Sequence, residues 1–140
     1  MKSADMPVEK VMQREYASVR SDERLDFVDD VMALGRVRHM PVVDGGKLVG
    51  VVTQRDLLAA SLSRALDFDA QERRAFLRSV NVGEVMAKKP ITVGQATTLE
   101  QAAQLMLRHK IGCLPVVGSD DEALGLVTET DLRRAAYAEG

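Results

Sequence analysis

The sequence predicts a mixed α/β fold built from two copies of one supersecondary unit. Three patterns occur in the same order in residues 8–57 and again in residues 82–132: Val-x-x-Val-Met, Pro-Val-Val and Gly-x-Val-Thr-x-x-Asp-Leu. In each copy, runs rich in β-branched residues alternate with stretches whose apolar residues recur at helical spacing. A repeat of this length is typical of units that bury their apolar faces against each other. We therefore expect a pseudo-symmetric pair of strand-helix-strand-strand-helix units.

The first copy is expected to occupy residues 1–66. Its predicted elements are a short strand at 17–19, a helix with Leu25, Val28 and Met32 on its apolar face, strands at 40–43 and 48–52, and a helix from about Arg55 to Leu66. Ser21 or Asp22 offers a side-chain oxygen to cap the first helix. The segment Asp44-Gly45-Gly46-Lys47 predicts a hairpin turn, because its glycines accept positive φ.

The second copy is expected to occupy residues 82–140 and to repeat this plan. Its predicted elements are a short strand at 91–93, a helix from Thr98 with Leu99, Ala102, Ala103 and Met106 inside, strands at 114–117 and 123–127, and a last helix from Thr130. Met12, Met32, Met86 and Met106 occur at matching places in the two copies, so we expect them to fill the core.

Residues 67–81 have no counterpart in the other copy and form the predicted connector. The connector holds Arg73, Arg74 and Arg78 beside Phe76 and Leu77, which predicts a short amphipathic helix. One interpretation is a solvated connector whose aromatic side chain packs on the domain. The other is a docking surface for an acidic partner.

Composition limits the broad class of the protein. The chain has 140 residues, of which 46% are hydrophobic and 29% are charged, as in a compact globular domain. No apolar run approaches the roughly 20 residues that cross a bilayer, and the first residues lack an apolar signal core, so we expect a cytoplasmic protein without membrane association. The net charge of −2 gives no overall attraction to nucleic acid.

The polar chemistry concentrates where a predicted strand ends and a helix begins, in Thr53-Gln54-Arg55-Asp56 and Thr128-Glu129-Thr130-Asp131. A threonine followed three residues later by an acid is typical of a helix cap. The same geometry also suits a nucleotide. The helix end attracts phosphate, and a carboxylate accepts hydrogen bonds from two ribose hydroxyls.

Together these patterns resemble a tandem pair of CBS domains, the module named after cystathionine β-synthase. The resemblance covers roughly residues 8–66 and 82–137. It implies a β-α-β-β-α unit in each repeat and a pseudo-twofold arrangement of the two repeats. It also implies two clefts that often bind adenosyl compounds, and a homodimer of the pair. In the family, each cleft takes adenine-binding residues from one repeat and the ribose-binding Thr-x-x-Asp from the other.

Carried over by position, the resemblance assigns residues to two clefts. The first cleft is expected to contain Thr53, Asp56, Arg38, His39, Lys89, Ile91, Thr92, Ile111, Gly112 and Cys113. The second cleft is expected to contain Thr128, Asp131, Glu15, Ala17, Ser18, Val37, Arg38 and His39. Glu15-Tyr16-Ala17 stands where the family usually has a proline, so the mouth of the second cleft is expected to differ.

The two clefts are expected to differ in charge. Family phosphates lie near the residues two and three before the proline of the Pro-Val-Val pattern, which for the first cleft are His39 and Arg38. For the second cleft the corresponding residues are Cys113 and Gly112, which bring no cation, and Glu15 repels phosphate. We expect the first cleft to bind a phosphorylated adenine nucleotide more tightly, and the second to bind weakly or to prefer a neutral or cationic adenosyl group.

Three classes of function follow from the sequence. The first, which we favour, is a regulatory sensor that binds AMP, ADP, ATP or S-adenosylmethionine and controls an unidentified protein partner, with no obligatory cofactor. The second is a ligand-free dimerisation module in which both Thr-x-x-Asp motifs only cap helices. The third is an enzyme, which we do not expect, because Cys113, His39 and His109 are too few for a metal or nucleophilic site. RNA binding would rest on the arginines of the connector alone and is also not expected.

Overall fold

The computed structural model describes residues 2–62 and 69–139, which fall into two compact units. Residues Ala17–Pro90 form the repeat-1 unit. Met1–Tyr16 and Ile91–Gly140 form the repeat-2 unit. Each unit contains the body of one repeat. The segment that leads into each repeat along the sequence belongs to the unit of the other repeat.

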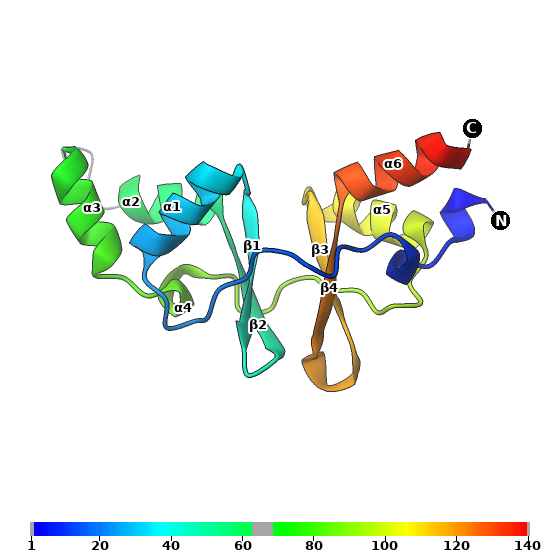
Figure 1. Ribbon diagram of the computed structural model, residues 1–140, viewed down its shortest axis with the longest axis horizontal. Coiled ribbons are helices and arrows are strands. Elements are labelled where there is room, and N and C mark those ends of the chain that lie inside the picture. The colour runs from blue at the N-terminus through cyan, green and yellow to red at the C-terminus, as the bar shows by residue number, and fades with distance from the viewer. Residues whose placement is uncertain (1, 63–68, 140) are drawn as a thin grey trace. The chain divides into compact units, whose positions relative to one another are not determined.

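The repeat-1 unit is a β-hairpin accompanied by helices (Figure 1). Its elements are α1 (Leu25–Gly35), β1 (His39–Asp44), β2 (Lys47–Thr53), α2 (Gln54–Leu62), α3 (Ala70–Arg78) and α4 (Val82–Val85). β1 and β2 pair antiparallel, and Gly45 and Gly46 between them have φ of 58° and 80°, which confirms the predicted turn. The predicted end of the second helix at Leu66 lies outside the described residues.

The repeat-2 unit follows the same plan. Its elements are η1 (Ser3–Asp5), η2 (Val8–Lys10), α5 (Leu99–His109), β3 (Cys113–Val117), η3 (Ser119–Asp121), β4 (Ala123–Thr128) and α6 (Glu129–Glu139). β3 and β4 pair antiparallel, and the turn between them places Asp120 and Asp121 at positive φ. Across residues 2–62 and 69–139, no helix has both the length and the apolar character needed to cross a membrane.

The short first strand expected in each repeat is reduced to a single bridge pair. Val19 bridges Val42 in parallel orientation, and Val93 bridges Val116 in the same way. All four valines are buried. These bridges therefore fix the path of the chain beside β1 and β3 without forming a longer ladder.

The predicted cap of α1 is wrong. The helix begins at Leu25, and its N-cap residue Arg24 makes no side-chain cap hydrogen bond. Ser21 instead donates to Asp44 through both its N–H (3.0 Å) and its hydroxyl (2.6 Å), which ties the entering segment to the end of β1. These hydrogen bonds lower the pKa of the Asp44 carboxyl below its usual range. The helix expected from Thr98 is confirmed: α5 begins at Leu99, and the Thr98 hydroxyl caps it by accepting from the Gln101 N–H at 3.1 Å.

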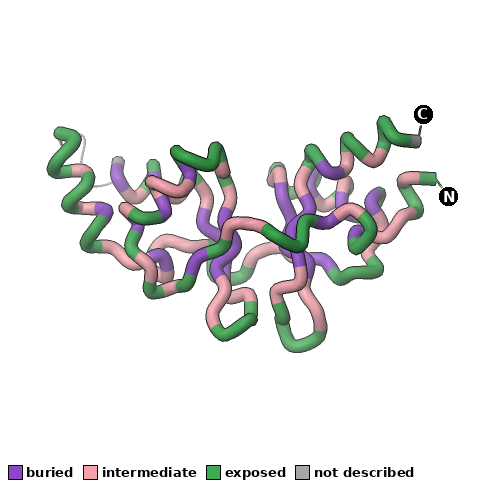
Figure 2. Tube along the Cα trace, viewed as in Figure 1, coloured by how far each residue is buried: buried purple, intermediate pink, exposed green. Residues whose placement is uncertain are grey.

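Each unit has its own hydrophobic core, seen as the buried segments in Figure 2. The repeat-1 core contains Val19, Leu25, Val28, Met32, Met40, Val42, Val52, Leu57, Leu77 and Val82. The repeat-2 core contains Val8, Met12, Val93, Leu99, Ala102, Met106, Leu114, Val116 and Val127. The predicted apolar faces of the first helix in each repeat are thus largely confirmed, and the methionines fill the cores as expected.

The exchanged leading segments are held by backbone bonds and by close packing on glycine. Gln13 pairs antiparallel with Leu126 in the repeat-2 unit, and Ala87 pairs with Val51 in the repeat-1 unit. A Cβ on Gly125 would lie 2.7 Å from the Met12 sulfur. A Cβ on Gly50 would lie 2.6 Å from the Met86 sulfur. The glycines of β2 and β4 therefore let each methionine lie directly on the hairpin.

Helix α3 confirms the predicted amphipathic connector and lies against α1. Leu77 is buried in the repeat-1 core, and the Asp69 side chain caps the helix at 2.8 Å. Three arginines pair with three aspartates of α1: Arg73 with Asp29 at 3.2 Å, Arg74 with Asp30 at 2.8 Å, and Arg78 with Asp26 at 3.7 Å. The Arg74 hydrogen bond lowers the pKa of Asp30. The arginine charges are thus engaged within the unit.

Candidate functional site

Thr53 and Asp56 lie where β2 ends and α2 begins. The Asp56 N–H donates to the Thr53 hydroxyl oxygen at 3.1 Å, and the Thr53 N–H donates to Asp56 Oδ2 at 2.8 Å. This reciprocal pair caps α2, as the local pattern predicts. In the described part of the chain, no donor reaches the second carboxylate oxygen, Oδ1, of this half-buried residue. Asp56 therefore keeps acceptor capacity for a ligand hydroxyl.

Two predicted phosphate-binding residues lie beside this motif in the same unit. His39 pairs with Thr53 in the register of the hairpin, and the Gln54 N–H donates to the Arg38 carbonyl oxygen at 3.0 Å. Arg38 is exposed, and its side chain is a guanidinium cation. The fold thus brings the Asp56 carboxylate and the Thr53 hydroxyl to the N-terminal end of α2, beside the backbone of Arg38.

Thr128 and Asp131 occupy the equivalent junction between β4 and α6. The Thr128 N–H donates to Asp131 Oδ2 at 2.8 Å, and the Asp131 N–H donates to the Thr128 hydroxyl at 3.2 Å, so the backbone cap is the same. The Thr128 hydroxyl also donates to Oδ2 at 3.0 Å. In addition, Nε2 of Gln13 lies 3.2 Å from Oδ2 and 3.3 Å from Oδ1. This carboxylate is buried at 6% exposure and is occupied by the protein itself.

Gln13 was not among the predicted site residues. A signal for it exists in the sequence, because the residue at the same place in the second copy is Ala87. The aligned copies differ there between an amide and a methyl group. The consequence of this difference depends on the packing of each leading segment on the other repeat's hairpin, which the sequence does not show.

Gly112 and Cys113, which lie beside the second motif, carry no cation. Cys113 pairs with Thr128 in the hairpin register, and the Glu129 N–H donates to the Gly112 carbonyl at 3.0 Å. Burial raises the pKa of the Cys113 thiol to about 11, so the thiol is neutral near pH 7. Within the described ranges, no three His, Cys, Asp or Glu side chains gather as metal ligands would.

The remaining predicted site residues are distributed over both units. Lys89, Ala17, Ser18 and Val37 lie in the repeat-1 unit, and Ile91, Thr92, Ile111 and Glu15 lie in the repeat-2 unit. Val37 and Ile111 occupy matching turns, because each donates its N–H to a methionine carbonyl of the preceding helix after a residue in left-handed conformation.

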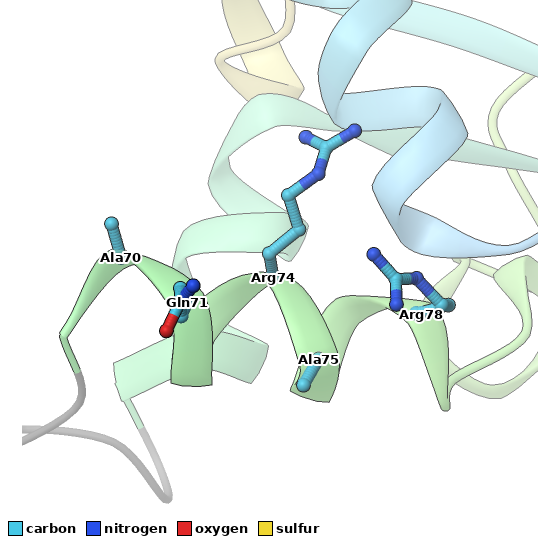
Figure 3. A pocket seen from close by; sticks show the side chains of 5 residues that line it. All are labelled: Ala70, Gln71, Arg74, Ala75 and Arg78. Carbon is cyan, nitrogen blue, oxygen red and sulfur yellow. The ribbon is translucent and has the colours of Figure 1, made fainter.

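Three surface hollows lined by described residues of a single unit leave out Thr53, Asp56, Thr128 and Asp131, although one of them includes Gln54 and Arg55. One of about 510 Å³ lies along α3 and is lined by Ala70, Gln71, Arg74, Ala75 and Arg78 (Figure 3). Its two arginines are already paired with α1, which leaves little charge there for a ligand. Another of about 390 Å³ includes Thr92, together with residues of α5.

A family model and a sequence relative of this chain point to the same protein family. The family model described as CBS domain matches residues 8–63 and 82–138. A CBS domain-containing protein of Dictyostelium discoideum is 31% identical over 126 residues, covering 89% of this chain and 87% of the relative. Inosine-5'-monophosphate dehydrogenase of Korarchaeum cryptofilum is 33% identical over 132 residues, but this chain spans only 25% of that enzyme's length.

A solved structure with high similarity carries a nucleotide. The crystal structure of CBSX2 in complex with AMP has a TM-score of 0.80 and 30% identity, covering 94% of this chain and 96% of that chain. The mixed fold of helices and small antiparallel sheets is therefore shared with a structure whose AMP complex is known.

Proposed function

Because the chain belongs to the CBS-domain family, we propose that it is a regulatory module that binds an adenine nucleotide and passes the binding event to a protein partner. The single observation that carries the proposal is the grouping of Thr53, Asp56, Arg38 and His39 in the repeat-1 unit. The AMP complex of CBSX2 supports the choice of ligand class.

Each group in this cluster has a separate task in the proposal. Asp56 Oδ1 accepts hydrogen bonds from the ribose hydroxyls, which a carboxylate can do for two vicinal donors. The Thr53 hydroxyl keeps its proton available while it accepts from the Asp56 N–H. Arg38 pairs with the phosphate, and the positive end of α2 adds to that attraction.

The adenine is assigned to the other predicted residues of the first cleft. These are Lys89, Ile91, Thr92, Ile111, Gly112 and Cys113. A ligand that needs groups from both repeats gains its full binding free energy in only one arrangement of them, so binding shifts the population toward that arrangement. This is the proposed signal to the partner.

The test is a thermal-shift and calorimetry series with AMP on matched variants. Asp56→Asn removes the charge but keeps an oxygen that can accept from the Thr53 N–H, so the helix cap survives. Asp131→Asn makes the same change at the equivalent place. A ligand at about 100 times its Kd stabilises the folded state by about 2.7 kcal/mol. We expect AMP to raise the Tm of wild type and Asp131→Asn, and to lose this effect in Asp56→Asn.

Two outcomes would contradict the proposal in different ways. If AMP binding survives in Asp56→Asn and is lost in Asp131→Asn, the cleft assignment is reversed. If neither AMP, ADP, ATP, NAD nor S-adenosylmethionine shifts the Tm of wild type, the sensor function is rejected.

A second candidate function is supported by the caps themselves. Both Thr-x-x-Asp motifs complete a reciprocal cap without any ligand, which is all that a ligand-free interaction module requires. Large apolar side chains are exposed on the helices, among them Leu34 at 88%, Leu107 at 79% and Tyr137 at 78%. They support the proposed homodimer. Native mass spectrometry of freshly purified protein would report both the oligomer and any retained small molecule.

A further inference from the structure

The two Thr-x-x-Asp motifs have the same backbone cap but different access to the carboxylate. Asp131 accepts from Thr128 N–H, from Thr128 Oγ1 and from Gln13 Nε2, and the amide of Gln13 reaches both of its oxygens. A carboxylate has about four acceptor positions. Those of Asp131 are largely used by the protein, whereas no donor within the described residues reaches Asp56 Oδ1.

The contrast at the second carboxylate oxygen, Oδ1, comes from one side chain on equivalent backbone frames. Gln13 exchanges hydrogen bonds with Leu126 at 2.8 and 3.0 Å, and Ala87 exchanges them with Val51 at 3.1 and 2.9 Å. The preceding methionine lies on the central glycine of the hairpin in both units. Because the backbone at residue 13 and the backbone at residue 87 are held alike, an amide at one place and a methyl group at the other is the difference that matters.

We propose that Gln13 is a built-in competitor for the ribose site of the second repeat. Its amide takes the place on Asp131 that the two hydroxyls of a ribose would occupy, so an adenosyl ligand must displace it before binding there. Ala87 places no such group on Asp56. The inference rests on the proposed function and deepens it by naming the residue that makes the two sites unequal.

The geometry suits displacement rather than a permanent block. Gln13 is an exposed residue, and its two contacts of 3.2 and 3.3 Å lie at the long end of the hydrogen-bond range. A hydrogen bond to a charged group is strong enough that a ligand which must displace it binds about tenfold or more weakly. We therefore expect binding at Asp131 to be weakened rather than abolished.

The chain offers a reciprocal pair of variants as the test. Gln13→Ala gives the second motif the residue that the first motif has, and Ala87→Gln does the reverse. AMP probes the Asp56 motif, which has Arg38 beside it, and S-adenosylmethionine probes the Asp131 motif, where Gly112 takes the place of Arg38. Both ligands are titrated into the full chain by calorimetry, with circular dichroism as a check of folding.

We expect Gln13→Ala to tighten S-adenosylmethionine binding at the second motif by about tenfold or more, and Asp131→Asn in that background to remove the gain. Ala87→Gln is expected to weaken AMP binding by about tenfold. Gln13→Asn, whose shorter side chain keeps an amide but cannot reach Asp131 equally, should behave like Gln13→Ala and serves if that variant is unstable.

The outcomes separate this inference from the proposed function. Nucleotide binding by wild type with unchanged affinities in Gln13→Ala, Gln13→Asn and Ala87→Gln would overturn the role of Gln13 and leave the sensor function standing. Equal affinity of both motifs in wild type would likewise overturn the role of Gln13 and leave the sensor function standing. Absence of binding by wild type and by every variant would overturn both.

Discussion

At the scale of single residues, burial determines the chemistry of Cys113. The thiol is 6% exposed, and burial raises its pKa to about 11. Since the thiolate is the reactive form, the folded protein should be labelled slowly by a thiol reagent at pH 8, and the rate should rise as the pH approaches 11.

The labelling is measured with Ellman's reagent in native buffer and in denaturant. Cys113 is the only cysteine, so every signal reports on it, and Cys113→Ala supplies the blank. Labelling of the folded protein at the denatured rate near pH 7 would contradict the prediction.

The caps at Thr53 and Thr128 show what a sequence reveals about single residues. Threonine and aspartate three positions apart contact each other through local geometry, so the pattern predicts the contact. The Gln13 contact with Asp131 joins residues 118 positions apart, and it depends on which hairpin the leading segment packs on. No local pattern carries that information.

At the scale of elements, the contact between each methionine and the hairpin glycine limits what the strands tolerate. A Cβ at Gly50 would lie 2.6 Å from the Met86 sulfur and 2.7 Å from the Ala87 carbonyl oxygen. The sulfur can move but the backbone carbonyl cannot do so easily. We expect Gly50→Ala to destabilise the protein by about 1–3 kcal/mol, as overpacking does, measured as a lower midpoint in urea.

Gly94→Ala is the matched control. A Cβ there would meet nothing within 4 Å, and Gly94 does not have a positive φ. Its effect on the midpoint should be small. Equal loss of stability in both variants would show that the close approach at Gly50 does not matter.

The elements differ in how well their sequences define them. The hairpin turn at Gly45-Gly46 and the start of α5 after Thr98 follow from local chemistry, and both were predicted. The start of α1 was not, because Ser21 donates to Asp44, 23 residues away, instead of capping the helix. Side chains with two possible partners are placed by the tertiary fold rather than by their neighbours.

At the scale of the whole molecule, each leading segment stabilises the unit of the other repeat. Val8 is fully buried in the repeat-2 core. We expect Val8→Ala to cost about 2 kcal/mol, from two lost methyl groups and the cavity left behind. Hydrogen exchange should then show weaker protection in β3 and β4, which follow Val8 by about a hundred residues, rather than in β1 and β2.

Val82→Ala provides the mirror experiment. Val82 is equally buried, but in the repeat-1 core, so its substitution should weaken β1 and β2 first. If each variant instead weakened the hairpin of its own repeat, the exchange of leading segments would be wrong.

The duplication is evident from sequence, but the exchange is not. Val-x-x-Val-Met precedes both hairpins at the same spacing, so the pattern allows either hairpin to receive either segment. Met12 packs on Gly125 and Met86 on Gly50, and because both methionines and both glycines occur at matching places in the copies, this contact does not reveal the exchange from sequence.

The position of residues 8–13 also has a consequence for biosynthesis. This stretch leaves the ribosome about a hundred residues before the strand that pairs with Gln13. The repeat-1 unit, by contrast, has all its residues once Pro90 has emerged. Translation therefore lets the repeat-1 unit mature early, while residues 8–13 stay exposed, as a substrate for chaperones or proteases, until β4 has been made.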